Sequence, residues 1–185
     1  MRQNTKMKKV FFKEEQKFGS RSLYLIMAAI YSIPVSIFLY AFYQQFVLKQ
    51  PWGDKPMSDN GLILTAILVL AVLSITSFLL FGSKLSVEVT NENLQFTFKP
   101  FIKKTIKYQK SDIEKFEIRE YKPIREYGGW GIKQGIKSIG KAYNVRGNIG
   151  LQLYLKNGKK VLIGTQRGDS LNRGMIKMME AKKNG

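Results

Sequence analysis

The sequence predicts an α+β membrane protein in which two apolar helices form a hairpin and an antiparallel β domain follows, ending in a helix. Two observations lead to this fold class. Residues 23–48 and 62–81 contain no charged side chain, and a helix of about 20 residues spans the roughly 30 Å hydrocarbon core of a bilayer. From about residue 83, apolar residues alternate with polar ones, which is typical of half-buried strands.

The first apolar run contains Pro34 and the pair Gln44-Gln45. We therefore expect a transmembrane helix over 23–48 that is kinked or tilted near the proline. A cleaved signal peptide fits less well, because its apolar region holds only about 7–15 residues. A buried helix of a soluble protein is the other alternative. The second run predicts a transmembrane helix over 62–81.

Small residues recur at four-residue intervals in the first run, and a helix places such residues on one stripe. A stripe of this kind lets a neighbouring backbone approach closely, although small residues also fall at this spacing by chance. The expected helix-packing residues are Ala28, Ser32 and Ser36, facing Ala71 and Ser74.

The distribution of basic residues predicts the orientation. Seven of them precede the first run: Arg2, Lys6, Lys8, Lys9, Lys13, Lys17 and Arg21. The connection 49–61 balances Lys49 and Lys55 with Asp54 and Asp59. Because cytoplasmic flanks carry the Lys/Arg excess, we expect both termini in the cytoplasm and the loop 49–61 outside.

Residues 1–22 predict a basic cytoplasmic leader. Its phenylalanines Phe11, Phe12 and Phe18 lie among lysines, a composition that favours a segment lying on the inner leaflet. The cytoplasmic domain is then expected to cover residues 83–182.

Alternation in this domain predicts six or seven antiparallel strands. The segment 90–93, "TNEN", separates the first two as a turn, and Asn157-Gly158 lies between the last two. Asn-Gly between alternating runs is a strong hairpin signal. The final segment places Leu171, Met175, Met178 and Met179 at helical spacing, with Asp169 or Ser170 as the expected cap. Gly174 weakens this helix by about 1 kcal/mol relative to alanine.

Three stretches carry a resemblance to a known family: "GGWGIK" (128–133), "KAYNVRGNIGLQL" (141–153) and "LIGTQRGDSL" (162–171). Together with "FFKEEQKF" (11–18) and "KPMSD" (55–59), they resemble bacterial pleckstrin-homology-like (PH-domain) membrane proteins with two spans and unknown function. The resemblance implies a PH-like antiparallel β-barrel or sandwich capped by a C-terminal helix, in the bacterial inner membrane. The chain departs from the pattern at Lys133, where arginine is expected, and at Arg167-Gly168, where proline is common.

The composition excludes much catalytic chemistry. The 185 residues include no cysteine and no histidine, which excludes thiol nucleophiles, imidazole bases and Cys/His zinc sites. Gly135, Gly140 and Lys141 match the spacing of a phosphate-binding loop, but Ala142 stands where magnesium requires Ser or Thr, and no strand–loop–helix unit surrounds them. A nucleotide-binding enzyme is thus the least favoured alternative.

No catalytic residue, cofactor or metal site is expected. The acidic residues that a paired-carboxylate enzyme would need lack a characteristic spacing; they are Asp112, Glu117, Glu120 and Glu126.

Basic residues dominate after residue 82, with 22 Lys or Arg against nine Asp or Glu, a net charge of +13. A domain tethered at a bilayer meets anionic headgroups first, so we do not expect a nucleic-acid partner. The turn Asn91-Glu92-Asn93 lacks a basic cluster, so specific inositide recognition is not expected. The densest basic patch is Lys99, Lys103, Lys104 and Lys107, with a solvated surface as the alternative interpretation.

The glycine-rich stretch 128–150 favours two interpretations. In the first, Trp130, Tyr143 and Asn144 form an internal packing corner. In the second, the stretch is a binding lip anchored by Trp130. The charges of the lip would be Lys133, Lys137 and Lys141.

The favoured function is a non-catalytic, membrane-anchored scaffold that binds a protein partner or assembles a membrane complex, and the alternative is an electrostatic sensor of anionic lipid surfaces.

Overall fold

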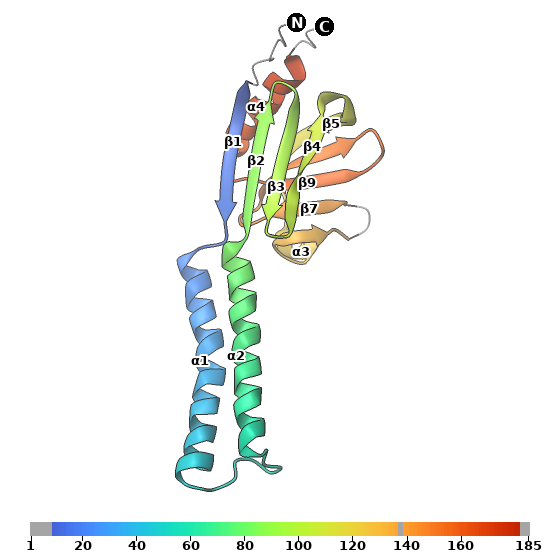
Figure 1. Ribbon diagram of the computed structural model, residues 1–185. Coiled ribbons are helices and arrows are strands. Elements are labelled where there is room, and N and C mark those ends of the chain that lie inside the picture. The colour runs from blue at the N-terminus through green and yellow to red at the C-terminus, as the bar shows by residue number, and fades with distance from the viewer. Residues whose placement is uncertain (1–8, 137–138, 182–185) are drawn as a thin grey trace, which may run out of the picture. The chain divides into compact units, whose positions relative to one another are not determined.

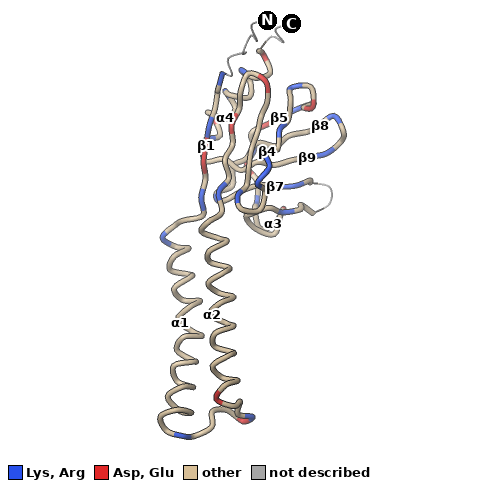
Figure 2. Tube along the Cα trace, in the orientation of Figure 1, with Lys and Arg blue, Asp and Glu red and all other residues tan. Residues whose placement is uncertain are grey.

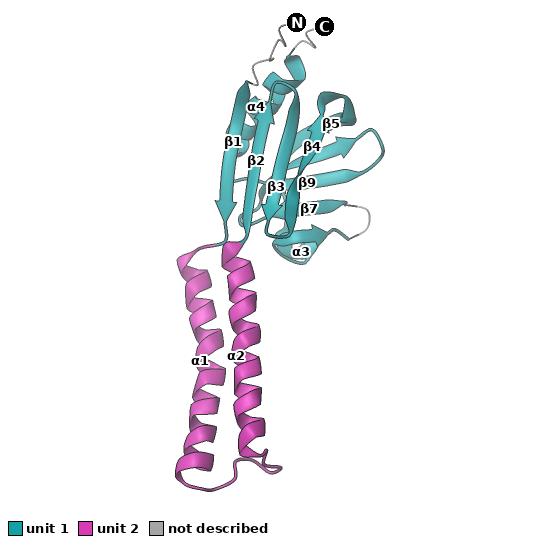
Figure 3. Ribbon diagram, in the orientation of Figure 1, with its two compact units in different colours: residues 1–18, 83–185 teal, residues 19–82 magenta. Residues whose placement is uncertain are grey.

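The computed structural model describes residues 9–136 and 139–181. The chain divides into two compact units (Figure 3): residues 19–82 form one, and residues 1–18 join residues 83–185 in the other. The helical unit is therefore an insertion within the chain of the β unit. We describe each unit by itself.

The helical unit contains α1 (Arg21–Phe42), which continues as the π-helix η1 (Tyr43–Val47), and α2 (Asp59–Gly82). Both helices are long and apolar enough to cross a membrane by length and composition. The α1 helix begins after Ser20, whose Oγ accepts a hydrogen bond from the Leu23 amide at 3.1 Å, an N-cap arrangement. Pro34 lies inside α1.

The two helices contact each other through aromatic and hydroxyl groups. Tyr31 and Ser77 are hydrogen-bonded through their hydroxyls at 3.0 Å, and the ring of Tyr24 stacks on Phe81 with centroids 5.0 Å apart. The remaining faces are open: Leu25 is 72% exposed. Helices with apolar side chains on every face are characteristic of an apolar surrounding.

The predicted stripe of small residues does not form the helix–helix contact. All five of its members are exposed: Ala28, Ser32, Ser36, Ala71 and Ser74. The physical reason is the helical rotation of about 100° per residue, which places Ser32 away from the face that carries Tyr31. Tyr24 and Tyr31, seven residues apart, lie on one side of α1 and provide the packing instead.

The β unit contains two separate sheets rather than a closed barrel (Figure 1). The first sheet is antiparallel with the order β1-β2-β3-β4; its strands are β1 (Val10–Lys17), β2 (Lys84–Thr90), β3 (Asn93–Lys99) and β4 (Ile102–Gln109). The second has the order β5-β8-β9-β7-β6; its strands are β5 (Ile113–Glu120), β6 (Gly131–Gln134), β7 (Lys141–Asn144), β8 (Ile149–Leu155) and β9 (Lys160–Gly164).

The second sheet corrects the prediction of six or seven antiparallel strands. Eight strands follow residue 82 in the described part of the chain, and β7 and β9 pair in parallel. The short 3-10 helix η2 (Lys110–Asp112) joins β4 to β5, and α3 (Pro123–Tyr127) lies between β5 and β6. The additional elements are three to five residues long, which is too short for a clear periodic signal.

Residues 10–17 of the segment that predicts a membrane-surface leader instead form strand β1, and residues 1–8 of that segment lie outside the described residues. Strand β1 pairs with β2 across the whole helical insertion, with Lys17 opposite Lys84. Phe12 is only 4% exposed and belongs to the hydrophobic core. Glu14 and Gln16 also point inward, where the Glu14 carboxylate accepts hydrogen bonds from the Thr165 hydroxyl and the Gln166 amide at 2.6 and 3.0 Å.

The main core lies between the two sheets and under α4 (Gly168–Glu180). The rings of Phe96 and Tyr143, which belong to different sheets, lie 4.8 Å apart between their centroids. The apolar face of α4 is confirmed, because Leu171, Met175 and Met178 are buried.

The predicted caps of α4 are wrong. The helix begins at Gly168, so both Asp169 and Ser170 lie inside it. The Thr165 hydroxyl instead accepts a hydrogen bond from the Arg167 amide at 3.0 Å.

Both predicted hairpin turns are confirmed. Gly158 has a φ of 77° between β8 and β9, as an Asn-Gly turn requires. Between β2 and β3, the Thr90 hydroxyl accepts hydrogen bonds from the amides of Glu92 and Asn93.

Candidate functional site: the hollow beside α3 and the lysine row of the first sheet

The short helix α3 starts at Pro123, whose fixed φ suits the first helical position. It ends at Gly128, which has a φ of 70°, the left-handed conformation that glycine adopts without a steric penalty. Five residues are too few for a stable isolated helix. Contacts to the second sheet must therefore hold α3 in place.

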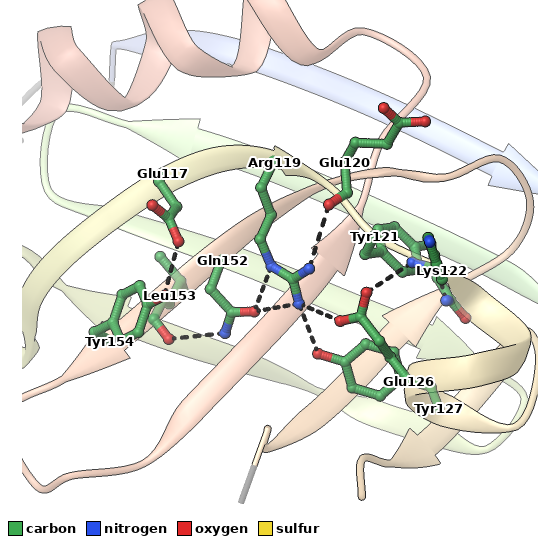
Figure 4. Close-up of polar contacts among 11 residues, drawn as sticks. Glu117, Arg119, Glu120, Tyr121, Lys122, Glu126, Tyr127, Gln152, Leu153 and Tyr154 are labelled. Atoms are coloured by element: carbon green, nitrogen blue, oxygen red, sulfur yellow. Dashed lines mark hydrogen bonds and ion pairs between the residues drawn. The ribbon is translucent and has the colours of Figure 1, made fainter.

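Arg119 on β5 supplies these contacts (Figure 4). Its Nη2 lies 2.8 Å from Oε2 of Glu126 and 3.4 Å from the hydroxyl of Tyr127, and its Nε donates to Gln152 on β8 at 3.2 Å. The other Glu126 oxygen accepts from the amide of Lys122 at 2.8 Å. The hydrogen bond from Arg119 lowers the pKa of Glu126, and burial raises the pKa of Tyr127.

A second group of hydrogen bonds fixes the chain after α3. The buried Asn144 donates to the hydroxyl of Tyr121 at 2.9 Å and accepts from the amide of Gly131 at 2.8 Å. Trp130 lies next to this corner, and its indole Nε1 donates to the carbonyl of Gly147 at 2.9 Å. The internal-corner interpretation therefore holds for Tyr143 and Asn144, whereas Trp130 remains 40% exposed.

These contacts shape an open hollow of about 620 Å³. Ile124 on α3 is 71% exposed, and the exposed Lys122 and Arg125 supply positive charge. Exposed apolar side chains beside an anchored aromatic ring are features of protein-binding surfaces. The lining residues are Glu120, Tyr121, Lys122, Pro123, Ile124, Arg125, Glu126, Trp130 and Asn148.

The other predicted lip residues do not line this hollow. Lys133 on β6 is half-buried opposite Ala142, and Lys141 on β7 is exposed opposite Gln134. Lys137 lies outside the described residues. The structure thus brings together Trp130 and α3, which sequence reasoning did not single out.

The glycines that match a phosphate-binding loop close this hairpin. The amide of Gly135 donates to the carbonyl of Gly140 at 2.7 Å. Gly140 has a φ of 93°, and a Cβ there would lie 2.0 Å from the carbonyl oxygen of Lys160. Glycine is therefore required at position 140 for a structural reason, because the chain there passes too close to β9 to leave room for a side chain.

The acidic residues of the domain take part in structural hydrogen bonds. Glu117 accepts from the Tyr154 hydroxyl at 2.7 Å, and Asp112 accepts from the amide of Gln109 at 2.8 Å. Glu120 accepts from the side-chain amide of Asn148. Among the described residues, no group of three or more acidic side chains is placed to hold a metal ion.

A second basic feature lies on the first sheet. Lys17, Lys84 and Lys99 are direct neighbours across β1, β2 and β3; we call them the lysine row. The turn after Lys99 exposes Phe101 to 57%. Figure 2 shows basic residues along the strands, whereas α1 and α2 carry no charge between their ends.

The structure divides the predicted basic patch. Lys103 and Lys104 follow the β3–β4 turn closely and are exposed, whereas Lys107 lies further along β4, opposite Gln95. Since β4 is an edge strand, lysines there also protect an unpaired edge from strand addition.

Comparison with known families finds no matching family model, and a search of curated proteins finds no match.

Proposed function

We propose that this protein is a non-catalytic binding or scaffold module, anchored in the bacterial inner membrane by the hairpin of α1 and α2. The β unit, a PH-like domain in this proposal, presents a docking site for a protein partner in the cytoplasm. One observation carries the proposal: the hairpin is inserted between β1 and β2, two strands that pair with each other.

This insertion supports two membrane crossings. Lys17 before the hairpin pairs with Lys84 after it, so the chain must leave and return on the same side of the bilayer. A signal peptide is disfavoured, because cleavage after α1 would remove β1 and the buried Phe12 from the fold. A core helix of a soluble protein is disfavoured by the exposed faces of both helices, on which Leu64 is 67% and Phe78 75% exposed.

The orientation is tested by cysteine accessibility, since the chain has no cysteine of its own. We expect a membrane-impermeant maleimide to label Asp54→Cys in intact cells. Lys156→Cys on the β unit should react only after lysis. Labelling of Lys156→Cys in intact cells would overturn the cytoplasmic placement.

The partner site proposed is the hollow beside α3. Its exposed Ile124 and Trp130 fit an apolar side chain of a partner, and the exposed Lys122 and Arg125 favour acidic residues next to that side chain. The net charge of +13 after residue 82 acts in the same direction at longer range.

A quantitative pull-down in mild detergent tests this site. Ile124→Glu should remove co-purifying protein, because the new carboxylate repels an acidic partner and the apolar contact is lost. Ile176→Glu is the matched control, since Ile176 is an exposed isoleucine of α4 that is not part of the hollow. Equal recovery with both variants, or recovery of the chain alone under all conditions, would count against this function.

A further inference from the structure

We propose that the lysine row and the β3–β4 turn bind the headgroups of anionic phospholipids. This inference rests on the proposed membrane anchor and goes beyond the partner site at α3. It concerns the end of the first sheet at which β1 finishes and β2 starts.

The register of the first sheet places the three lysines on one face. Inward residues alternate with outward ones along each strand, and Gln16, Leu85 and Phe98 are the inward neighbours of the row. Lys17, Lys84 and Lys99 therefore all lie on the outer face, each opposite the next. Directly opposite side chains have Cβ atoms about 5 Å apart, and like charges there repel each other.

The fold supplies little to offset this repulsion. Within the described part of the chain, Lys84 forms an ion pair with Glu15 at 2.8 Å, while Lys17 and Lys99 have no ion pair. The hydrogen bond from Lys84 first, and the charges of Lys84, Lys13 and Lys17 after it, lower the pKa of Glu15, so this carboxylate is ionised at neutral pH. One carboxylate against three ammonium groups leaves an excess of positive charge, which attracts an external anion.

The chain connections identify that anion as a headgroup. Residues 18–20 join β1 to α1, and Ser83 alone joins α2 to β2. A chain extends at most about 3.6 Å per residue. With α1 and α2 spanning the bilayer, these lengths keep Lys17 and Lys84 within reach of the headgroup layer, whatever the angle between the two units.

The β3–β4 turn extends the same surface. Because Lys99 pairs with Lys84 and Phe98 with Ile102, this turn lies at the same end of the sheet as both connections. Phe101 is 57% exposed at its tip, and Lys103 and Lys104 follow it. An apolar ring among lysines matches a surface of apolar chains under anionic headgroups.

The experiment uses the full chain reconstituted into vesicles. Phe101→Cys is labelled with an environment-sensitive fluorophore, and spin-labelled lipids quench it on contact with the bilayer. We expect stronger quenching in phosphatidylcholine vesicles that contain phosphatidylglycerol than in phosphatidylcholine alone, and loss of the difference at high salt. A label at Glu92→Cys, in the turn at the opposite end of β2 and β3, should not respond.

Removing the charges of the lysine row tests whether these lysines bind the headgroups. In the labelled chain, Lys17→Gln, Lys84→Gln and Lys99→Gln together should abolish the phosphatidylglycerol-dependent quenching. The control removes the same charge at the exposed lysines of the β8–β9 hairpin, with Lys156→Gln, Lys159→Gln and Lys160→Gln, and should retain it. Equal quenching in both lipids, or equal loss with both triple variants, would overturn the inference. Carbonate extraction of the same samples reports membrane anchorage separately, so failure of the anchor is distinguishable from failure of the lysine row.

Discussion

Replacing Gly174 with alanine is expected to destabilise the protein, although helix propensity alone predicts the opposite. Alanine inside a helix is favoured over glycine by about 1 kcal/mol. In the structure, however, a Cβ at this position would lie 2.9 Å from the Cβ of Phe12 on β1. Overpacking a core contact costs about 1–3 kcal/mol. The Phe12 Cβ is fixed to a paired strand and cannot swing away, so we expect a net loss of about 1 kcal/mol.

Thermal unfolding in mild detergent measures this effect. A Trp52→Phe background leaves Trp130, in the β unit, as the single tryptophan reporter. A loss of about 1 kcal/mol in a unit of this size lowers the midpoint by about 2–6 °C. Asn172→Ala is the control, because it raises helix propensity in the same helix at a half-buried position, and it should raise the midpoint slightly.

A Gly174→Ala protein that is more stable than the original would refute the reasoning. It would show that helix propensity outweighs the contact, and therefore that α4 does not pack closely on β1. The assignment of the N-terminal segment to the core would then lose its main energetic support.

Three further substitutions test other contacts by the same assay. Phe12→Ala should cost about 3–5 kcal/mol as a core truncation, whereas a change in a solvated leader would stay within about 0.5 kcal/mol. Thr165→Ala should cost about 1.5–3 kcal/mol because the buried Glu14 carboxylate loses its hydroxyl donor, and Thr165→Ser should restore most of this. Glu126→Gln should cost about 0.5–1 kcal/mol at neutral pH, since its ion pair with Arg119 is partly exposed. Because this folded-state pKa is lowered, the contribution is present above the ordinary carboxyl pKa and lost as pH falls through the lowered value; a difference between the two proteins that persists in acid would contradict this assignment.

Local signals account for the parts of the fold that the sequence predicts correctly. The Asn157-Gly158 turn requires only its own two residues and the alternation beside it. The two apolar runs are equally local, because length and composition suffice to identify them as long apolar helices. The face along which they contact each other was not predictable in this way, because large aromatic side chains rather than small residues form it.

Strand β1 was not predictable from its own residues. Glu14 and Gln16 occupy two of its inward positions, so the segment lacks the apolar alternation of a half-buried strand. Their hydrogen-bond partners are supplied from far along the chain: Gln16 donates to the carbonyl of Gly164 at 2.8 Å, and Glu14 accepts from Thr165. Inward polar residues are tolerated only with such partners.

The candidate site was predicted in part, by residue type rather than by position. Trp130 was singled out as a large aromatic residue in a glycine-rich stretch, and it does line the hollow. Ile124 was missed because α3 is too short to show helical periodicity. Its position after Pro123 was the available signal, since proline favours the first turn of a helix.

The connections of β1 couple the two ends of the chain through the core. β1 continues through three residues into α1, while its inward side chains are held by residues 164–166, directly before α4. Gly174 of α4 in turn lies against Phe12 of the same strand. Because buried carboxylate hydrogen bonds are costly to break, these contacts hold β1 and α4 together within the β unit.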